Sequence, residues 1–175
     1  ICYTKFIQNE NHWDFEILNC QTLPYSKEWE DALRNAIHLS GEKLLQLNSD
    51  YGFFLGKKVS EFITENNIQK LDMIASHGHT VFHQPQHRFT FQIGDGRAIK
   101  AVTSQKVVYD FRSQDVILGG NGAPLVPIGD EYLFSDYDAC LNLGGFSNIS
   151  IKRNGKRIAF DICPVNIILN ELAAR

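Results

Sequence analysis

The sequence lacks both a strong excess of one charge and a long apolar run. Its 17 basic and 20 acidic residues are mixed along 175 positions and give a formal net charge of −3, so it has no basic footprint for a nucleic-acid partner. Hydrophobic residues make up 43% of the chain, but no run approaches the roughly 20 apolar residues that a membrane helix needs. We therefore expect a soluble globular chain with no nucleic-acid and no membrane partner.

Cysteine and methionine are scarce. The cysteines are far apart and form no C-x-x-C pair: Cys2, Cys20, Cys140 and Cys163. With no secretory leader before them, this spacing argues against a zinc knuckle or a disulfide framework, and a cytoplasmic location is expected. The only methionine is Met73, so the chain starts at Ile1 without an initiator. It stops at Arg175 in a predicted helix, and we interpret both ends as cuts through a larger protein.

Strand-like and helix-like patterns alternate, which predicts an α/β architecture with a mixed sheet. The expected strands cover residues 1–7, 13–22, 71–75, 89–93 and 106–110, the first two as a hairpin around the polar turn 8–12. The expected helices cover residues 27–39, 50–66, 97–103 and 125–134. The stretch from Ser76 to Pro85 is expected as a loop, and Pro124 is expected in the first turn of the last helix.

Two turn dipeptides, Gly144-Gly145 and Asn154-Gly155, divide residues 140–166 into an antiparallel meander. Glycine lets backbone N–H groups approach an anion closely, so the first turn fits a phosphate cradle. Asp161, which we expect to leave the third strand, is then the candidate base. From these residues alone, an ordinary hairpin with a surface aspartate is an equal alternative.

Histidines recur within one stretch, as His77, His79, His83 and His87. A metal-dependent hydrolase using His77 and His79 is one interpretation, because imidazole is the commonest biological zinc ligand. Gly78 and Pro85 interrupt any helix that would stack these rings. Structural or hydrogen-bonding histidines are therefore the favoured interpretation, and no metal ligand is assigned.

Arg112 follows the expected strand 106–110, where its guanidinium suits a carboxylate or a phosphate. A salt bridge with Asp110 or Asp115 explains it equally well. The glycine-dense turn 119–122 resembles a P-loop only loosely, because it lacks the lysine and the Ser/Thr of that motif.

Together, five stretches resemble the anhydro-N-acetylmuramic acid kinases of the sugar kinase, heat-shock ATPase and actin superfamily. They are SHGHTVFHQP, FQIGDG, VVYDFRSQDVILGGNGAPLVP, LNLGGFSNIS and DICPVN, in the family's order and at similar spacing. The resemblance implies mixed-sheet, actin-like ATPase (ribonuclease H-like) lobes. Residues 1–138 would form most of the first, sugar-binding lobe, and residues 139–175 would open the second. The family's first phosphate loop, Ser-Gly-Thr-Ser-Leu-Asp-Gly, is absent from this sequence.

The resemblance implies a kinase that depends on ATP and Mg²⁺. Such an enzyme opens the 1,6-anhydro ring of anhydro-N-acetylmuramic acid with water and phosphorylates O6, which gives N-acetylmuramic acid 6-phosphate in cell-wall recycling. The family's catalytic aspartate falls on Asp161, and its sugar-binding arginine falls on Arg112. The candidate contacts from its histidine-rich sugar loop are His77, Thr80 and His83.

The family's second phosphate loop falls on Gly144 and Gly145, with Asn166 as a further candidate nucleotide contact. The sequence departs from the family after Asp161, where Ile162-Cys163-Pro164-Val165 replaces Thr-Gly-Pro-Gly. It also has Asn121 where the family usually has glutamine. Losing two glycines removes positive-φ freedom beside the base, which bears on the local backbone and on substrate preference.

The expected partners are ATP and a small-molecule anhydro-sugar, with a related sugar such as levoglucosan as an alternative. A homodimer stays open, without an assigned interface. The 175 residues alone are expected to be inactive, because one phosphate loop is missing. Besides the hydrolase, a noncatalytic homologue that acts as a binding module is an alternative function, based on the altered residues after Asp161.

Overall fold

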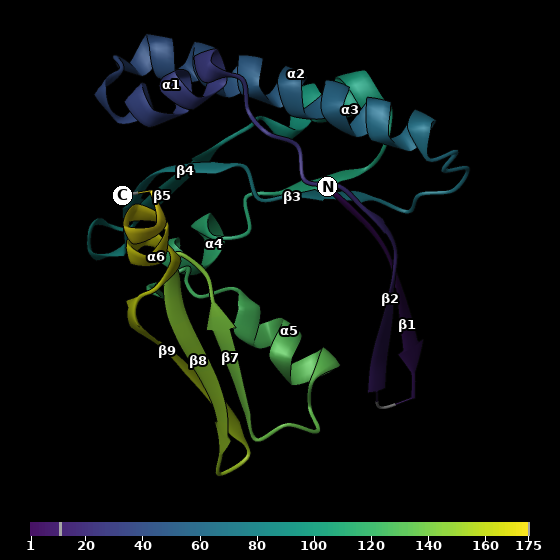
Figure 1. Cartoon of the computed structure of the whole chain (residues 1–175), viewed down its shortest axis with the longest axis vertical. Coiled ribbons are helices and arrows are strands. Elements are labelled where there is room, and N and C mark those ends of the chain that lie inside the picture. Colours follow the sequence, from purple (N-terminus) through teal and green to yellow (C-terminus); the bar gives the residue numbers. More distant parts are fainter. Residues whose placement is uncertain (11, 175) are drawn as a thin grey trace. The chain divides into compact units, whose positions relative to one another are not determined.

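A computed structural model describes residues 1–10 and 12–174 of the chain (Figure 1). Asn11, in the predicted turn, and Arg175 lie outside the described residues. The chain divides into two compact units, each of which is described by itself. The first combines Ile1–Tyr3 with Asn19–Gly122, and the second combines Thr4–Leu18 with Ala123–Arg175. Within the described residues, no helix is long and apolar enough to cross a membrane.

The opening hairpin is confirmed. Its strands are β1 (Cys2–Asn9) and β2 (His12–Cys20), and they form a two-stranded sheet. Two hydrogen bonds close its base, because the amino group of Ile1 donates to the Gln21 carbonyl at 2.7 Å and the Gln21 N–H donates to the Ile1 carbonyl at 2.8 Å.

Two capped helices begin the first unit. The hydroxyl of Ser26 accepts from the Trp29 N–H and starts α1 (Lys27–Asn35), which a 3-10 turn, η1 (Ala36–His38), extends. The next helix, α2 (Gly41–Glu65), begins well before the expected residue 50, because the hydroxyl of Ser40 accepts from the Lys43 N–H and caps it there.

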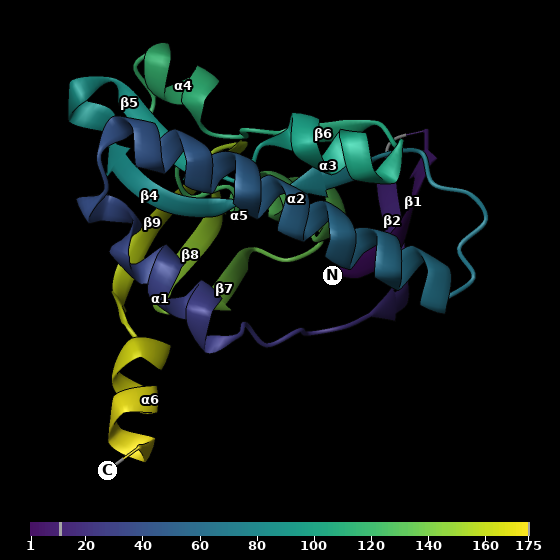
Figure 2. The ribbon, with the colours of Figure 1, turned by 90° about the horizontal axis from the view of Figure 1, so that it is seen from above.

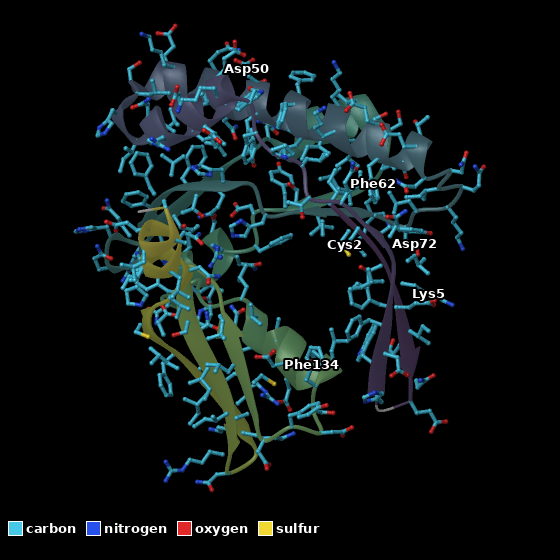
Figure 3. The ribbon with its side chains drawn as sticks, in the orientation of Figure 1. Cys2, Lys5, Asp50, Phe62, Asp72 and Phe134 are labelled. Atoms are coloured by element: carbon cyan, nitrogen blue, oxygen red, sulfur yellow. The ribbon has the colours of Figure 1, made fainter. Side chains whose placement is uncertain are left out.

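The helix α2 is amphipathic and supplies much of the core. Phe62 lies on its side that faces the strands, whereas Asp50 points away from them (Figure 3). The buried side chains of the core cluster are Leu33, Ala36, Leu44, Tyr51 and Ile93. Helix α3 (Gly96–Thr103) packs along α2 (Figure 2). Gly52 permits this approach, since a Cβ there would lie 2.6 Å from the Asp95 carbonyl oxygen.

Four short strands form two separate sheets in the first unit. The strands β3 (Ile74–Ser76) and β6 (Val107–Tyr109) pair in parallel, and β4 (His79–Gln84) and β5 (Phe89–Ile93) pair in antiparallel. The expected loop from Ser76 to Pro85 was wrong, because its second half forms β4 and then a 3-10 turn, η2 (Pro85–His87). Backbone pairing with β5 and packing of Phe82 and Phe91 on the core stabilise this strand.

Helix α4 (Ser113–Ile117) was not predicted and completes the first unit. The second unit contains α5 (Val126–Leu133), the meander β7 (Ala139–Leu143), β8 (Phe146–Arg153) and β9 (Lys156–Pro164), and α6 (Asn166–Ala173). Pro127, rather than Pro124, lies in the first turn of α5. The meander is confirmed, but Asp161 lies within β9 instead of leaving it.

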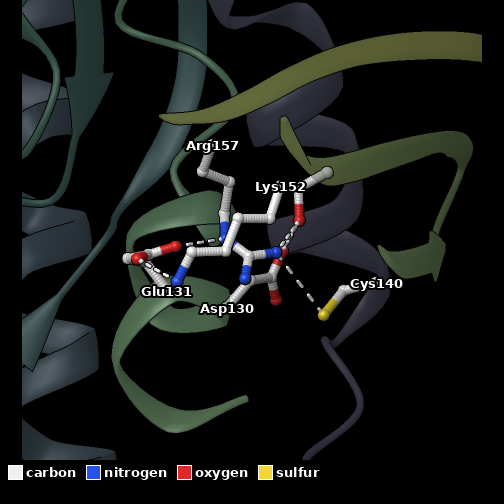
Figure 4. A network of polar contacts seen from close by, with 6 residues as sticks. Asp130, Glu131, Cys140, Lys152 and Arg157 are labelled. Carbon is white, nitrogen blue, oxygen red and sulfur yellow. Dashed lines mark hydrogen bonds and ion pairs between the residues drawn. The ribbon is translucent and has the colours of Figure 1, made fainter. Parts of the chain in front are cut away.

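A polar network joins α5 to one face of the meander (Figure 4). Glu131 accepts from Arg157 Nε at 2.8 Å and from Lys152 Nζ at 3.1 Å, while the hydroxyl of Ser150 donates to Asp130 at 2.5 Å. The Arg157 side chain is only 5% exposed, and its hydrogen bond to Glu131 raises the pKa of its guanidinium. The chain therefore has the mixed α/β architecture that was expected, with several small sheets.

Candidate functional site

His77 and Arg112 meet because two parallel strands end side by side. The register pairs Ser76, the last residue of β3, with Tyr109, the last residue of β6. His77 directly follows the first strand, and Arg112 stands at the start of α4, shortly after the second. The carboxyl ends of parallel strands are where open α/β sheets bind ligands. The structure thus brings two predicted sugar contacts together at such an edge.

The hydrogen bonds of His77 fix its tautomer. Arg112 Nε donates to His77 Nε2 at 3.0 Å, and His77 Nδ1 lies 3.0 Å from the Gly78 carbonyl oxygen. Since a guanidinium only donates, Nε2 is the acceptor and the ring proton is on Nδ1. The Nε2 lone pair is therefore used by Arg112, and a metal ion at that atom would have to displace it.

Arg112 also orders the glycine-dense turn. Its Nη1 donates to the Gly122 carbonyl at 2.6 Å, and the Gly122 N–H donates to Asp115 at 2.7 Å. Asp110 accepts from the Ser113 N–H, and among the described residues neither Asp110 nor Asp115 forms an ion pair with Arg112. Burial lowers the pKa of Arg112, although an arginine stays charged in proteins. No hydrogen bond to Nη2 is present among the described residues, which leaves donors for a ligand.

Thr80 and His83 share one face of the β4–β5 hairpin. A bulge at Val81 shifts the register, so that Thr80 pairs with Gln92 and His83 pairs with Thr90. The hydroxyl of Thr90 donates to the Phe82 carbonyl and accepts from His83 Nδ1 at 3.1 Å. His83 therefore has its proton on Nδ1, and its Nε2 is available as an acceptor on an exposed side chain.

His79 lies on the opposite face, where it pairs with Ile93. Burial is the largest cause that lowers the pKa of this imidazole, and the neighbouring His77 lowers it further. In residues 1–10 and 12–174, no group of three His, Cys, Asp or Glu side chains is placed to hold a metal ion.

In the second unit, Asp161 stands on an edge strand beside a bulge. It pairs with Asn148, whereas Cys163 pairs with Ser147, so Ile162 is the extra residue of β9. Bulges often re-aim side chains next to active sites. None of the residues 162–165 adopts a positive φ. The four residues that replace the family's glycine-containing motif therefore do not need the positive φ that glycine would allow.

The Gly144-Gly145 turn packs against the start of α6. Its carbonyl oxygens accept from the Asn166 N–H at 3.2 Å and from the Val165 N–H at 2.8 Å, and Asn166 Nδ2 donates to the Leu143 carbonyl at 3.2 Å. Among the described residues, the N–H groups of Gly144 and Gly145 donate to no carbonyl oxygen in a turn, loop or helix cap. These two donors fit an anion such as a phosphate.

Two further polar residues, Asn142 and Asn148, were not singled out from the sequence. The register places Asn142 opposite Asn148, and Asn148 opposite Asp161. Directly opposed residues in antiparallel strands have their side chains on the same face. The three side chains therefore form one row across the meander. The length of the turn between the strands does not by itself predict this row.

Comparisons with known proteins agree with the resemblance. A sequence model of the family described as anhydro-N-acetylmuramic acid kinase matches residues 6–175. A protein of that name from Paramagnetospirillum magneticum is 37% identical over 158 residues, which cover 87% of this chain and 44% of the relative. Proteins of the same name from Bacillus cereus and Bacillus thuringiensis are each 32% identical to this chain over 177 residues, which cover 91% of this chain and 46% of each relative. The chain thus spans about half the length of these relatives, and it belongs to the anhydro-N-acetylmuramic acid kinase family.

Proposed function

We propose that this chain supplies the base and the sugar-binding residues of a kinase that hydrolytically opens anhydro-N-acetylmuramic acid and phosphorylates it with ATP. One observation carries the proposal. The exposed carboxylate of Asp161 lies toward the end of the meander that carries Gly144 and Gly145, whose N–H groups donate to no turn, loop or cap carbonyl among the described residues. A base and an anion-binding turn are what this chemistry requires of the second unit.

In the proposed reaction, the Asp161 carboxylate accepts a proton from water while the water oxygen attacks the anomeric carbon. The bond between that carbon and O6 breaks, and O6 accepts the terminal phosphoryl group of ATP. The products are N-acetylmuramic acid 6-phosphate and ADP. Because the departing oxygen is itself the phosphate acceptor, no second carboxylic acid is required.

The first unit would bind the sugar. Arg112 offers Nη2 as a charged donor, held in place by His77 and by the Gly122 carbonyl. On the β4–β5 hairpin, Thr80 offers an exposed hydroxyl and His83 an exposed Nε2 acceptor. A guanidinium held in one orientation, with a few polar neighbours, suits the carboxylate and hydroxyl groups of an acidic amino sugar.

ATP and Mg²⁺ are the proposed cofactors. Gly144 and Gly145 would hold phosphate oxygens through their N–H groups, and Asn166 would keep the turn against α6. Mg²⁺ supplies charge neutralisation on the phosphates. It is commonly held by phosphates and water with few protein ligands, so no ligand in this chain is assigned. A cytoplasmic location and a role in cell-wall recycling belong to the same proposal.

The test is Asp161→Asn in the full-length protein, measured as ATP-dependent formation of the sugar 6-phosphate. We expect kcat to fall by at least about 10³-fold, because the base is lost while the shape is kept. Asp138→Asn is the matched control, since Asp138 is exposed and its carboxylate makes no hydrogen bond among the described residues. Turnover by Asp161→Asn near that of the control would refute the assignment.

A further inference from the structure

Among the described residues of the meander, Asp161 has one polar cross-strand neighbour that can orient it. β9 is an edge strand of the sheet β7-β8-β9 in the described residues, so Asp161 has a cross-strand partner on one side only, and that partner is Asn148. Their Cβ atoms are expected about 4.5–5.5 Å apart, within reach of an amide and a carboxylate. Along β9, the preceding residue on the same face is Ala159, which has no polar group.

Toward the far turn, the described polar side chains on this face make hydrogen bonds or ion pairs with α5. The next row toward the far turn contains Ser150, whose hydroxyl donates to Asp130 of α5. The row after that pairs Lys152 with Arg157, and both side chains form ion pairs with Glu131. Within this unit, α5 therefore binds these two rows, and among the described residues no hydrogen bond from α5 reaches Asn148, which is partly exposed, or Asp161, which is exposed.

The row continues toward the glycine turn. Asn142, opposite Asn148, has its Nδ2 atom 4.0 Å from the position that a Cβ on Gly144 would take. Amide donors therefore extend from the candidate base to the candidate phosphate turn. Among the described residues, neither Asn148 nor Asp161 makes a side-chain hydrogen bond, so both are available to each other and to a ligand. Catalytic hydrogen bonds of this kind often tighten only when substrate binds.

We propose that Asn148 is a positioning residue that donates through Nδ2 to the Asp161 carboxylate and holds it toward the attacking water. The inference rests on the proposed role of Asp161 as base. A carboxylate on an exposed edge strand is otherwise free to rotate, and catalysis by proton transfer requires a fixed geometry. Asn148 supplies that constraint without adding a charge beside the base.

The experiment compares Asn148→Ala and Asn148→Asp with Asp161→Asn in the full-length protein, by measuring kcat and KM from pH 5 to 9. Asn148→Ala should lower kcat about 10- to 100-fold with little change in KM for ATP, because a hydrogen bond to a charged group is lost. Asn148→Asp places a like charge directly opposite the base. It should move the acidic limb of the kcat profile to higher pH, since the two carboxylates then compete for a proton.

Asn154→Asp is the matched control, because Asn154 lies in the far turn of the same meander. It should leave both kcat and the acidic limb as in the wild type. The inference is overturned if both Asn148 variants keep kcat and the pH profile within twofold of this control while Asp161→Asn is inactive. If Asp161→Asn is itself active, the base assignment fails first and the two failures are distinguishable.

Discussion

The Nε atom of Arg112 donates a hydrogen bond to Nε2 of His77 at 3.0 Å, between residues 35 positions apart. With Nη1 bound to the Gly122 carbonyl, the guanidinium is held at two of its nitrogens. A donor that is already ordered loses little side-chain entropy when it binds a ligand. His77 therefore contributes to the proposed sugar site through Arg112, whether or not its own ring contacts the sugar.

Replacing His77 should weaken sugar binding more than turnover. In His77→Leu, Arg112 loses the acceptor at Nε, and we expect KM for the anhydro-sugar to rise about tenfold with kcat little changed, because uniform binding is lost. His77→Gln keeps an acceptor oxygen near the position of Nε2 and should retain most of the affinity. Steady-state kinetics with each substrate varied in turn measures both.

The ATP arm of that experiment is the internal control. KM for ATP should be the same in both variants as in the wild type. An equal rise of both KM values, or an equal loss in His77→Gln and His77→Leu, would mean that the His77–Arg112 hydrogen bond does not position the guanidinium.

Tyr51 should make the protein sensitive to alkaline pH. It is 2% exposed, and burial, followed by its 2.6 Å hydrogen bond with Tyr25, raises its pKa above the usual value near 10. A raised folded-state pKa gives stability that is complete below the unfolded-state pKa and is lost as pH rises beyond it toward the folded-state value. The free energy of unfolding should therefore fall from about pH 10 upward, by at most about 1.4 kcal/mol per pH unit.

The pair Tyr51→Phe and Tyr25→Phe separates this effect from the loss of a hydrogen bond. Each substitution removes the same bond and should cost about 1 kcal/mol at pH 7. Only Tyr51→Phe should reduce the fall in the free energy of unfolding above pH 10, measured by urea unfolding, because Tyr25→Phe keeps the buried hydroxyl of Tyr51. Parallel curves for the two variants above pH 10 would contradict the assignment to Tyr51.

Local signals in the sequence predicted much of the fold. The N-cap Ser26 and the strand Phe89–Ile93 were recovered because capping and β-branched or aromatic runs act over a few residues. Local signals predict a loop in place of β4, since the stability of this strand comes from pairing with β5 and from the core. The early start of α2 was missed, although Ser40 is a recognisable cap.

The arrangement of the candidate site depends on register, which local signals set poorly. A two-residue turn at Gly144-Gly145 would place Asn148 opposite Leu141, whereas the observed register places it opposite Asn142. One position of slip exchanges the two faces of a strand, so the row that contains Asp161 could not be derived from the turn alone. The meeting of His77 with Arg112 likewise follows from the parallel pairing of β3 and β6.

Gly52 should be essential for the packing of α3 on α2. A Cβ there would lie 2.6 Å from the Asp95 carbonyl oxygen and 2.9 Å from the Ala98 Cβ, and backbone atoms cannot rotate away. We expect Gly52→Ala to lower the free energy of unfolding by about 1–3 kcal/mol. Gly41→Ala, in the same helix and with nothing within 4 Å, is the control and should not destabilise. Equal urea midpoints for the two variants would contradict the close approach.

Gly145→Ala tests the phosphate turn with little structural disturbance. An added Cβ would lie 3.4 Å from Ile167 Cγ1, an ordinary contact, and Gly145 does not have a positive φ. The thermal midpoint should therefore stay within about 2 °C of the wild type, as for a substitution that costs less than 0.5 kcal/mol. If phosphate oxygens approach the Gly145 N–H closely, the methyl group will obstruct them, and kcat/KM for ATP should fall at least tenfold while KM for the sugar is kept.

Gly129→Ala, with open space around it, controls for the added methyl group. Unchanged ATP kinetics in a folded Gly145→Ala protein would remove this turn from the nucleotide site.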